Sequence, residues 1–303
     1  MQSKKLKLIH LGILLCLSVF AFSTHSAAQQ KDGLLKIYFF DVGQGDAIFI
    51  EAPNGNQVLI DGGPDNMVVQ KLGETMPFYD KDIDLVVMTH SDADHVTGLI
   101  EVLKRYEVES IVYSNIVRDS ALYGAWQEAV GEEDANIADP VSGKVIDLGS
   151  GVTLTIVHPA ESLASQKMEK TNNDSVVLTL KYGEMEVLLA GDIEAKAERQ
   201  IILNSNLVEG APPQGLNADI LKVGHHGSKT STTGEFLYEV SPQVAIIQVG
   251  AKNRYGHPTQ EVLKRLEDYG IRYYRTDTDG DIKVVSDGEN YQIITANSNL
   301  LIF

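Results

Sequence analysis

Two histidines and two aspartates stand within six residues of the chain, at His90, Asp92, Asp94 and His95. An apolar run at 83–88 precedes them and predicts a buried strand, and residues 96–106 predict a helix. The four side chains would then lie at the carboxyl end of a strand, where open α/β sheets carry their sites. Imidazole and carboxylate suit zinc, manganese or iron. Four such groups exceed what one tetrahedral ion needs, so the spacing favours two metals over a polar loop with capping aspartates.

A second polar group follows a predicted strand at 219–223. It combines paired histidines with hydroxyls and a lysine, at His225, His226, Ser228, Lys229 and Ser231. Other predicted strands end in residues that could serve the same site, namely Asp61, His158, Asp192, Asn253 and His257. We expect Asp192 to bridge metals, because a small residue before it admits close approach. His158 could be a ligand, but a hydrogen-bonded loop histidine explains it better. Convergence of the strand ends in one cleft predicts a single domain over 31–303.

Composition limits the classes of partner. The chain has 303 residues, 43% of them hydrophobic, and a formal net charge of −17. Three lysines and no acid lie in residues 1–28, so the remainder is three charges more negative than the whole. An acidic body argues against a broad electrostatic footprint on nucleic acid. It leaves room for a local basic groove or for phosphate binding through metals.

The first 28 residues resemble a secretory signal peptide. Lysines at 4, 5 and 7 precede an apolar stretch at 8–22, and Ser26-Ala27-Ala28 offers a small-residue cleavage site. We therefore expect export to the periplasm or the medium without stable membrane embedding, with an uncleaved anchor as the alternative. Cys16 is the only cysteine and lies in this leader. The exported chain would have no thiolate, so its metal site must use His, Asp, Glu or Asn.

Together these motifs resemble the metallo-β-lactamase superfamily, and within it the hydrolase domain of ComEC-like competence proteins. The matching segments are 41–47, 59–63, 89–95, 172–175, 189–192, 222–228 and 255–258. The resemblance implies an α/β (α+β) fold, a four-layer αββα sandwich, with two divalent ions between its sheets. Zinc is the expected metal, and manganese is the alternative.

The resemblance also implies an assignment of ligands. His90 and Asp92 would hold the first metal, and Asp94, His95 and His225 the second, with Asp192 between them. His226, Asp41 and Asp61 would support these ligands from behind. Asp92 stands where the superfamily usually has a histidine, and a second usual histidine is absent near 171–175. Asn173 or a substrate oxygen would fill that gap.

A hydroxide shared by two metals would be the nucleophile that attacks an ester-type bond. Asp94 would orient the hydroxide, and His257 would protonate the leaving group. The substrate would be gripped by Asn173, Ser228, Lys229, Ser231 and Asn253. We expect an exported phosphodiesterase that can act on DNA; the alternative is a hydrolase of a small ester, lactone or amide. A non-catalytic binding protein is a third class, and the sequence leaves the oligomeric state open.

Overall fold

A computed structural model describes residues 33–168, 171–205, 216–296 and 301–302. From Leu34 onward, contacts group the described residues into one compact unit. The predicted signal peptide, with Cys16, lies outside the described residues. Among those described, no helix is long and apolar enough to cross a membrane.

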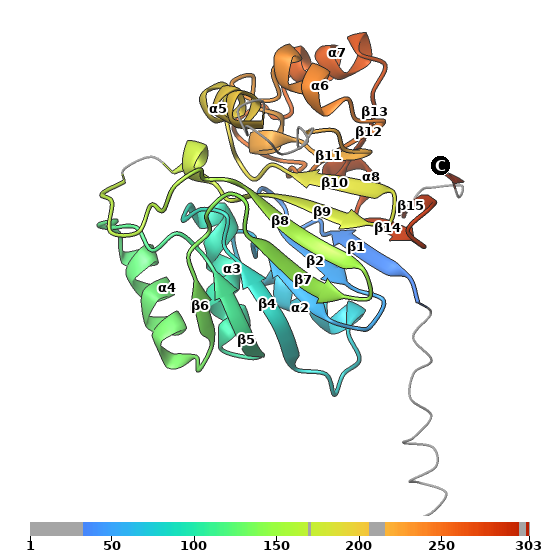
Figure 1. Ribbon diagram of the computed structural model, residues 1–303. Coiled ribbons are helices and arrows are strands. Elements are labelled where there is room, and N and C mark those ends of the chain that lie inside the picture. The colour runs from blue at the N-terminus through green and yellow to red at the C-terminus, as the bar shows by residue number, and fades with distance from the viewer. Residues whose placement is uncertain (1–32, 169–170, 206–215, 297–300, 303) are drawn as a thin grey trace, which may run out of the picture. The chain divides into compact units, whose positions relative to one another are not determined.

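The compact unit contains two β-sheets (Figure 1). The first has nine strands in the order β16 (Leu301–Ile302), β15 (Tyr291–Thr295), β14 (Ile282–Ser286), β1 (Leu35–Phe39), β2 (Ile48–Glu51), β3 (Gln57–Ile60), β4 (Asp82–Val87), β5 (Glu107–Val112), β6 (Asn136–Ala138). The second has seven, in the order β13 (Arg272–Arg275), β12 (Val244–Ile247), β11 (Ile220–Lys222), β10 (Met185–Leu189), β9 (Val177–Tyr182), β8 (Val152–His158), β7 (Val145–Gly149).

Alternating side chains build the core between the sheets. In β1, Leu35, Ile37 and Phe39 are buried and join β8's Leu154 and Ile156 in one apolar cluster. Period-two burial of this kind is what a strand with one covered face requires. The central strands β10–β12 instead have buried residues on both faces, because helices cover their outer side.

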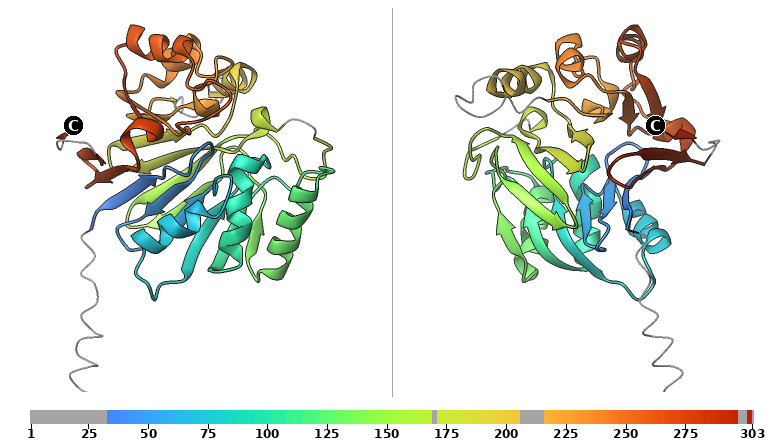
Figure 2. Two further views of the ribbon diagram at one scale, coloured as in Figure 1. Left: turned by 180° about the vertical axis from the view of Figure 1, so that it is seen from behind. Right: turned by 45° about the vertical axis from the view of Figure 1, so that its right-hand side comes forward.

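Helices cover the outer face of each sheet, as Figures 1 and 2 both show. Those on the first sheet are α2 (Met67–Thr75), α3 (Ala93–Leu103) and α4 (Ala121–Glu132). Those on the second are α5 (Ala195–Ser205), α6 (Gly234–Val240) and α7 (Gln260–Asp268), and the short α8 (Thr276–Asp279) follows β13. Two apolar clusters, one under each helix layer, flank the core between the sheets. The predicted four-layer αββα sandwich is confirmed.

Parallel pairing determines where the polar side chains gather. Strands β3, β4 and β5 of the first sheet run parallel, as do β10, β11 and β12 of the second. In each sheet the carboxyl ends of these strands therefore lie along one edge. Helix α3 begins at Ala93, three residues before the predicted start, and its first turn therefore includes Asp94 and His95. The two edges meet, because His95 from the first half of the chain lies 3.4 Å from Asp192, which follows β10.

Candidate metal centre

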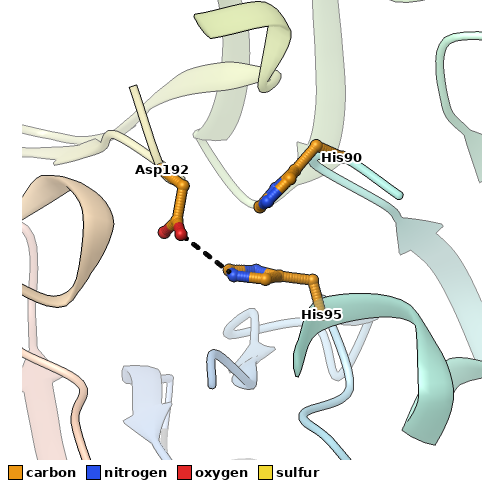
Figure 3. A group of neighbouring side chains, drawn as sticks. All are labelled: His90, His95 and Asp192. Atoms are coloured by element: carbon orange, nitrogen blue, oxygen red, sulfur yellow. Dashed lines mark ion pairs between the residues drawn. The ribbon is translucent and has the colours of Figure 1, made fainter. Parts of the chain in front are cut away.

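Imidazole and carboxylate groups from both sheets converge at this shared edge. They form four overlapping groups of three, and within each group the ligand atoms lie within 4.8 Å of one another. In Figure 3 the side chains of His90 and His95, from the segment after β4, and of Asp192, which follows β10, point toward one another. The groups are His90–His95–Asp192, Asp94–His95–His226, Asp46–Asp192–His226 and Asp46–Asp61–His95.

Asp61 orients His95 from behind. Its backbone has a φ of 58°, in the left-handed region, and the Thr89 N–H and hydroxyl donate to its carboxylate at 2.8 and 2.6 Å. His95 Nδ1 lies 2.8 Å from Asp61 Oδ2. The proton of His95 is therefore held on Nδ1, and Nε2 faces Asp192. The sequence predicted a supporting role for Asp61, and its carboxylate lies behind the His95 ring.

His90 presents an unused nitrogen to the same space. Its Nδ1 lies 3.1 Å from the Thr89 hydroxyl, and its buried Nε2 has no hydrogen-bond partner among the described residues. Burial, together with the neighbouring His95, lowers the pKa of His90 to about 4. A buried lone pair left without a partner is uncommon in native proteins. His90 thus offers a neutral donor nitrogen of the kind that a metal accepts.

His226 is the inward-facing member of the histidine pair. Its Nδ1 lies 2.9 Å from the Gln248 carbonyl oxygen, which leaves Nε2 3.3 Å from Asp94 Oδ2 and 3.4 Å from Asp192 Oδ2. Burial would lower the pKa of His226, but the carboxylates of Asp192 and Asp46 outweigh it and raise the pKa to about 10. The sequence predicted that this histidine stands behind the ligands, whereas the geometry brings it among them.

His225, the predicted ligand of the pair, lies at the rim. Both histidines have positive φ, and their rings point in different directions. His225 Nδ1 lies 3.4 Å from Glu194 Oε1, and the Asn172 amide approaches its ring at 3.3 Å. Its Nε2 is 4.0 Å from Asp192 Oδ2, and it belongs to none of the four ligand groups found among the described residues.

Asp192 is shared between the histidines and a buried lysine. Its Oδ2 faces His95 and His226, whereas Oδ1 lies 3.8 Å from Lys222 Nζ. Burial alone would raise the pKa of the Asp192 carboxyl, but the two imidazoles and Lys222 hold it well below its usual value. Lys222 is 1% exposed, pairs with Asp46 and donates to the Gly191 carbonyl at 3.0 Å. The ammonium group thus occupies one side of both carboxylates.

Asp92 is held by a cation on the opposite side of the cluster. Arg118 Nη1 donates to Asp92 Oδ1 at 2.8 Å, and the Thr171 hydroxyl donates to the same oxygen at 3.1 Å. The other oxygen, Oδ2, lies 3.8 Å from His90 Nε2. Asp92 therefore has one carboxylate oxygen left for a metal beside His90.

Several residues predicted to bind substrate instead organise loops. Asn173 Oδ1 accepts from the Glu194 and Ala197 N–H groups at the start of α5. Ser231 donates to the Gly224 carbonyl at 2.7 Å, and the Ser228 hydroxyl lies 2.9 Å from that of Thr230. Asn173 is thus bonded to the start of α5, whereas Ser228 and Ser231 make these contacts within their own loop.

Of the remaining predicted residues, His257 faces the site, and the others do not contact the ligand groups in the bonds described here. Lys229 is exposed, and the Asn253 amide closes its own loop by donating to the Gly250 and His257 carbonyls. His257 faces the site: its ring centroid lies 5.7 Å from that of His225, and burial beside His225 and His226 lowers its pKa to about 4. His158 Nε2 lies 3.0 Å from the Asn173 carbonyl oxygen, so it supports that loop.

Three residues in and around the cluster were missed. Asp46 lies beside His226 and Lys222, whereas Asp41, the aspartate chosen from the same turn, accepts from Gly43 N–H at 3.2 Å. Lys222 is the second missed residue. A lysine in a strand that is otherwise apolar, such as β11, could have indicated a buried acidic partner. Arg118 lies in an irregular segment after β5, and we find no sequence signal for its role.

The donor set fits divalent metal ions. Carboxylate oxygens and neutral imidazole nitrogens are ligands that zinc and manganese accept. His90 Nε2 provides a buried donor without a hydrogen bond in the described chain, and Asp61 and the Gln248 carbonyl fix the rings of His95 and His226. Ligands oriented by such partners are typical of metal sites.

Comparisons with known proteins agree with this geometry. The model of the metallo-beta-lactamase superfamily matches residues 40–251. The chain is 33% identical over 270 residues to ComE operon protein 3 of Bacillus subtilis, covering 82% of this chain and 32% of that protein. It is 29% identical over 286 residues to Recombination protein 2 of Haemophilus influenzae, covering 90% of this chain and 31% of the relative. The chain therefore spans about a third of the length of these curated relatives.

A solved structure supports the fold alone. A variant of the CmlA beta-hydroxylase aligns with a TM-score of 0.50 and 12% identity, over 82% of this chain and 53% of that one. The family match covers most of the chain and includes the residues that bring His90, His95, Asp192 and His226 together. The chain belongs to the metallo-β-lactamase superfamily, whose fold in general serves metal-dependent hydrolysis.

Proposed function

We propose that the chain is an exported, two-metal phosphodiesterase for which DNA is one substrate. The observation that carries the hydrolytic part is the convergence of His90, His95 and His226 on Asp192. The diester part is supported by relatives named as competence and recombination proteins. Export rests on the secretory pattern of residues 1–28.

We assign the ligands from the distances. His90 and Asp92 Oδ2 would hold one ion, Asp94, His95 and His226 the other, and Asp192 Oδ2 both. In this assignment His226 replaces the predicted His225. Zinc is the first expectation and manganese the alternative, because both accept imidazole and carboxylate.

The residues around the ligands prepare the site. When bound, two divalent ions supply a hydroxide nucleophile near neutral pH and polarise the oxygen on which charge develops. Asp61 and the Gln248 carbonyl accept from the Nδ1 atoms of His95 and His226, so that each Nε2 points toward Asp192. Lys222 holds Asp192 by Oδ1 and leaves Oδ2 toward the histidines. Donors held in place before reaction lower the reorganisation that catalysis needs.

We assign to His257 the contact with the leaving group. It is half-buried, its Nδ1 has no hydrogen-bond partner among the described residues, and its ring faces His225. With a pKa lowered to about 4 by burial and the neighbouring histidines, it is neutral at pH 7. A neutral imidazole can donate a hydrogen bond from one nitrogen to a departing oxygen.

A small ester, lactone or amide is the second candidate substrate. The net charge of −17 favours it, since the chain as a whole repels polyanions. A phosphodiester would need local cations at the site mouth to overcome this charge.

The test measures hydrolysis of bis(p-nitrophenyl) phosphate and of single-stranded DNA by the zinc- or manganese-loaded chain. Asp192→Ala should lower kcat by at least about 100-fold, because it removes the carboxylate shared by both ligand sets. Glu184→Ala, a change in an exposed turn, is the matched control. If the metal-loaded wild-type chain cleaves neither substrate but hydrolyses esters, lactones or amides, the phosphodiesterase proposal is wrong.

A further inference from the structure

A series of aromatic rings leads from solvent to the metal centre. Tyr255 is 55% exposed, and its ring lies almost parallel to that of His257, at 17° and 5.8 Å between centroids. His257 in turn lies 5.7 Å from His225, whose centroid is 6.1 Å from that of His226. The rings of His257 and His225 therefore connect the outermost ring, Tyr255, to His226 in the candidate metal centre.

The loop that carries Tyr255 is positive in an acidic chain. Between Val249 and Thr259 it contains Lys252 and Arg254 and no acidic residue, whereas the whole chain has a net charge of −17. Both cationic side chains are exposed. The Arg254 guanidinium lies 5.2 Å from the centre of the Tyr255 ring, and its Nη2 donates to the Tyr255 hydroxyl at 3.2 Å. A planar cation and an aromatic ring thus stand together at the mouth.

Internal hydrogen bonds hold this loop in place. Asn253 Oδ1 accepts from the N–H groups of Tyr255 and His257, and its amide donates to the carbonyls of Gly250 and His257. The loop is also anchored to the first sheet's turn, because Gly250 N–H donates to Gln44 Oε1 at 3.2 Å. A Cβ on Gly250 would lie 2.6 Å from the Gln44 backbone nitrogen. The ring is therefore presented by an ordered support, which lowers the entropy cost of binding.

We propose that Tyr255 and Arg254 form a platform on which a base of single-stranded nucleic acid stacks, while a phosphodiester further along the same strand lies at the metal centre. This inference rests on the proposed phosphodiesterase function and names the substrate class. Aromatic rings bind every base by its π-face, and nearby cations contact the backbone. A single strand suits the site, because a base must leave a duplex stack to reach an exposed ring. Lys252 and Arg254 supply local positive charge, which a phosphodiester substrate needs because the chain as a whole is negatively charged.

The test compares a short thymidine oligonucleotide with an abasic strand of the same length. Binding to the zinc-loaded full chain is followed by fluorescence anisotropy, recorded before turnover. The wild-type chain should prefer the thymidine strand by about 5- to 100-fold, the range expected for one stacked base. Tyr255→Ala should bring this ratio close to one, and Tyr255→Trp should keep it. Tyr238→Ala, which removes a 73% exposed tyrosine from α6, is the matched control and should bind as wild type.

The ratio separates stacking from folding and from chemistry. A misfolded variant would lose affinity for both strands, whereas loss of stacking lowers affinity for the thymidine strand alone. The inference is overturned if the wild-type chain does not distinguish the strands, or if Tyr255→Ala keeps the preference. Because the ratio needs no turnover, the platform can be established even if hydrolysis of diesters is not found. Cleavage of DNA without any base preference would retain the phosphodiesterase and reject the platform.

Discussion

Asp192 is the residue at which the two halves of the chain meet chemically. Its Oδ2 lies 3.4 Å from both His95 Nε2 and His226 Nε2, and Lys222 lies on the side of Oδ1. His226 is turned toward it because the Gln248 carbonyl accepts the proton of Nδ1. His225, its neighbour in sequence, is turned toward Glu194 instead. The two histidines therefore have different surroundings despite identical chemistry.

Substitution of each histidine tests this division. His226→Ala should remove one of two zinc equivalents, because it deletes a donor that faces Asp94 and Asp192. His225→Ala should retain both, with affinity changed by less than the roughly 10- to 100-fold typical of residues behind the ligands. Zinc content after gel filtration, with circular dichroism to establish folding, measures both. Loss of a zinc equivalent in His225→Ala alone would restore the original assignment.

At the scale of elements, the contact between α3 and the turn after β3 determines where the ligands stand. Gly62 N–H donates to the His95 carbonyl at 2.8 Å, and Gly98 N–H donates to the Gly63 carbonyl at 3.1 Å. The two backbones touch, since a Cβ on Gly98 would lie 1.8 Å from the Gly62 carbonyl oxygen. Asp61, which orients His95, belongs to the same turn. The helix start and the turn thus form one support for the site.

Alanine substitution at two helix-interior glycines distinguishes this support from ordinary helix propensity. Gly98→Ala should lower the free energy of unfolding by about 1–3 kcal/mol or more, because backbone must move to admit the methyl group. Gly124→Ala, at an exposed position of α4, should raise it by about 0.5–1 kcal/mol, since a Cβ there meets no described atom within 4 Å. Urea unfolding of the metal-free chain measures both. Equal effects of the two substitutions would show that α3 has room to adjust.

The sequence predicted these elements better than it predicted which atoms meet. Buried parallel strands occur in the sequence as continuous apolar runs. The ends of the strands near Asp61, His90 and Asp192 could therefore be predicted from the sequence. The Lys222–Asp46 pair joins segments distant in the chain, and no local pattern specifies it. The orientation of His225 likewise depends on Glu194 and that of His226 on Gln248, and both partners lie on other segments. Local sequence therefore predicts which residues reach the edge, and tertiary packing decides which way they face.

For the whole unit, the metal centre joins the two sheets. His90, Asp94 and His95 come from the segment after β4, whereas Asp192 and His226 follow strands of the second sheet. Ions bound by both sets would bind the folded chain and not the unfolded one. Such binding raises the free energy of unfolding by about 2.7 kcal/mol at 100 times the dissociation constant. Global stability should consequently respond to both metal and pH.

The metal-free chain should be most stable near pH 6.5. The pKa values of His95 and His226 are raised, the latter to about 10, so their contribution is complete below 6.5 and is lost as the pH rises toward 10. His90 and His257, whose pKa values are lowered to about 4, contribute above 6.5 and lose that contribution as the pH falls toward 4. Urea midpoints of the demetallated chain should therefore be lower at pH 5 and at pH 9 than at 6.5. Zinc, which needs neutral imidazoles, should move the maximum to higher pH. A metal-free chain that is most stable at pH 9, or an optimum that zinc does not shift, would contradict the charge arrangement around Asp192.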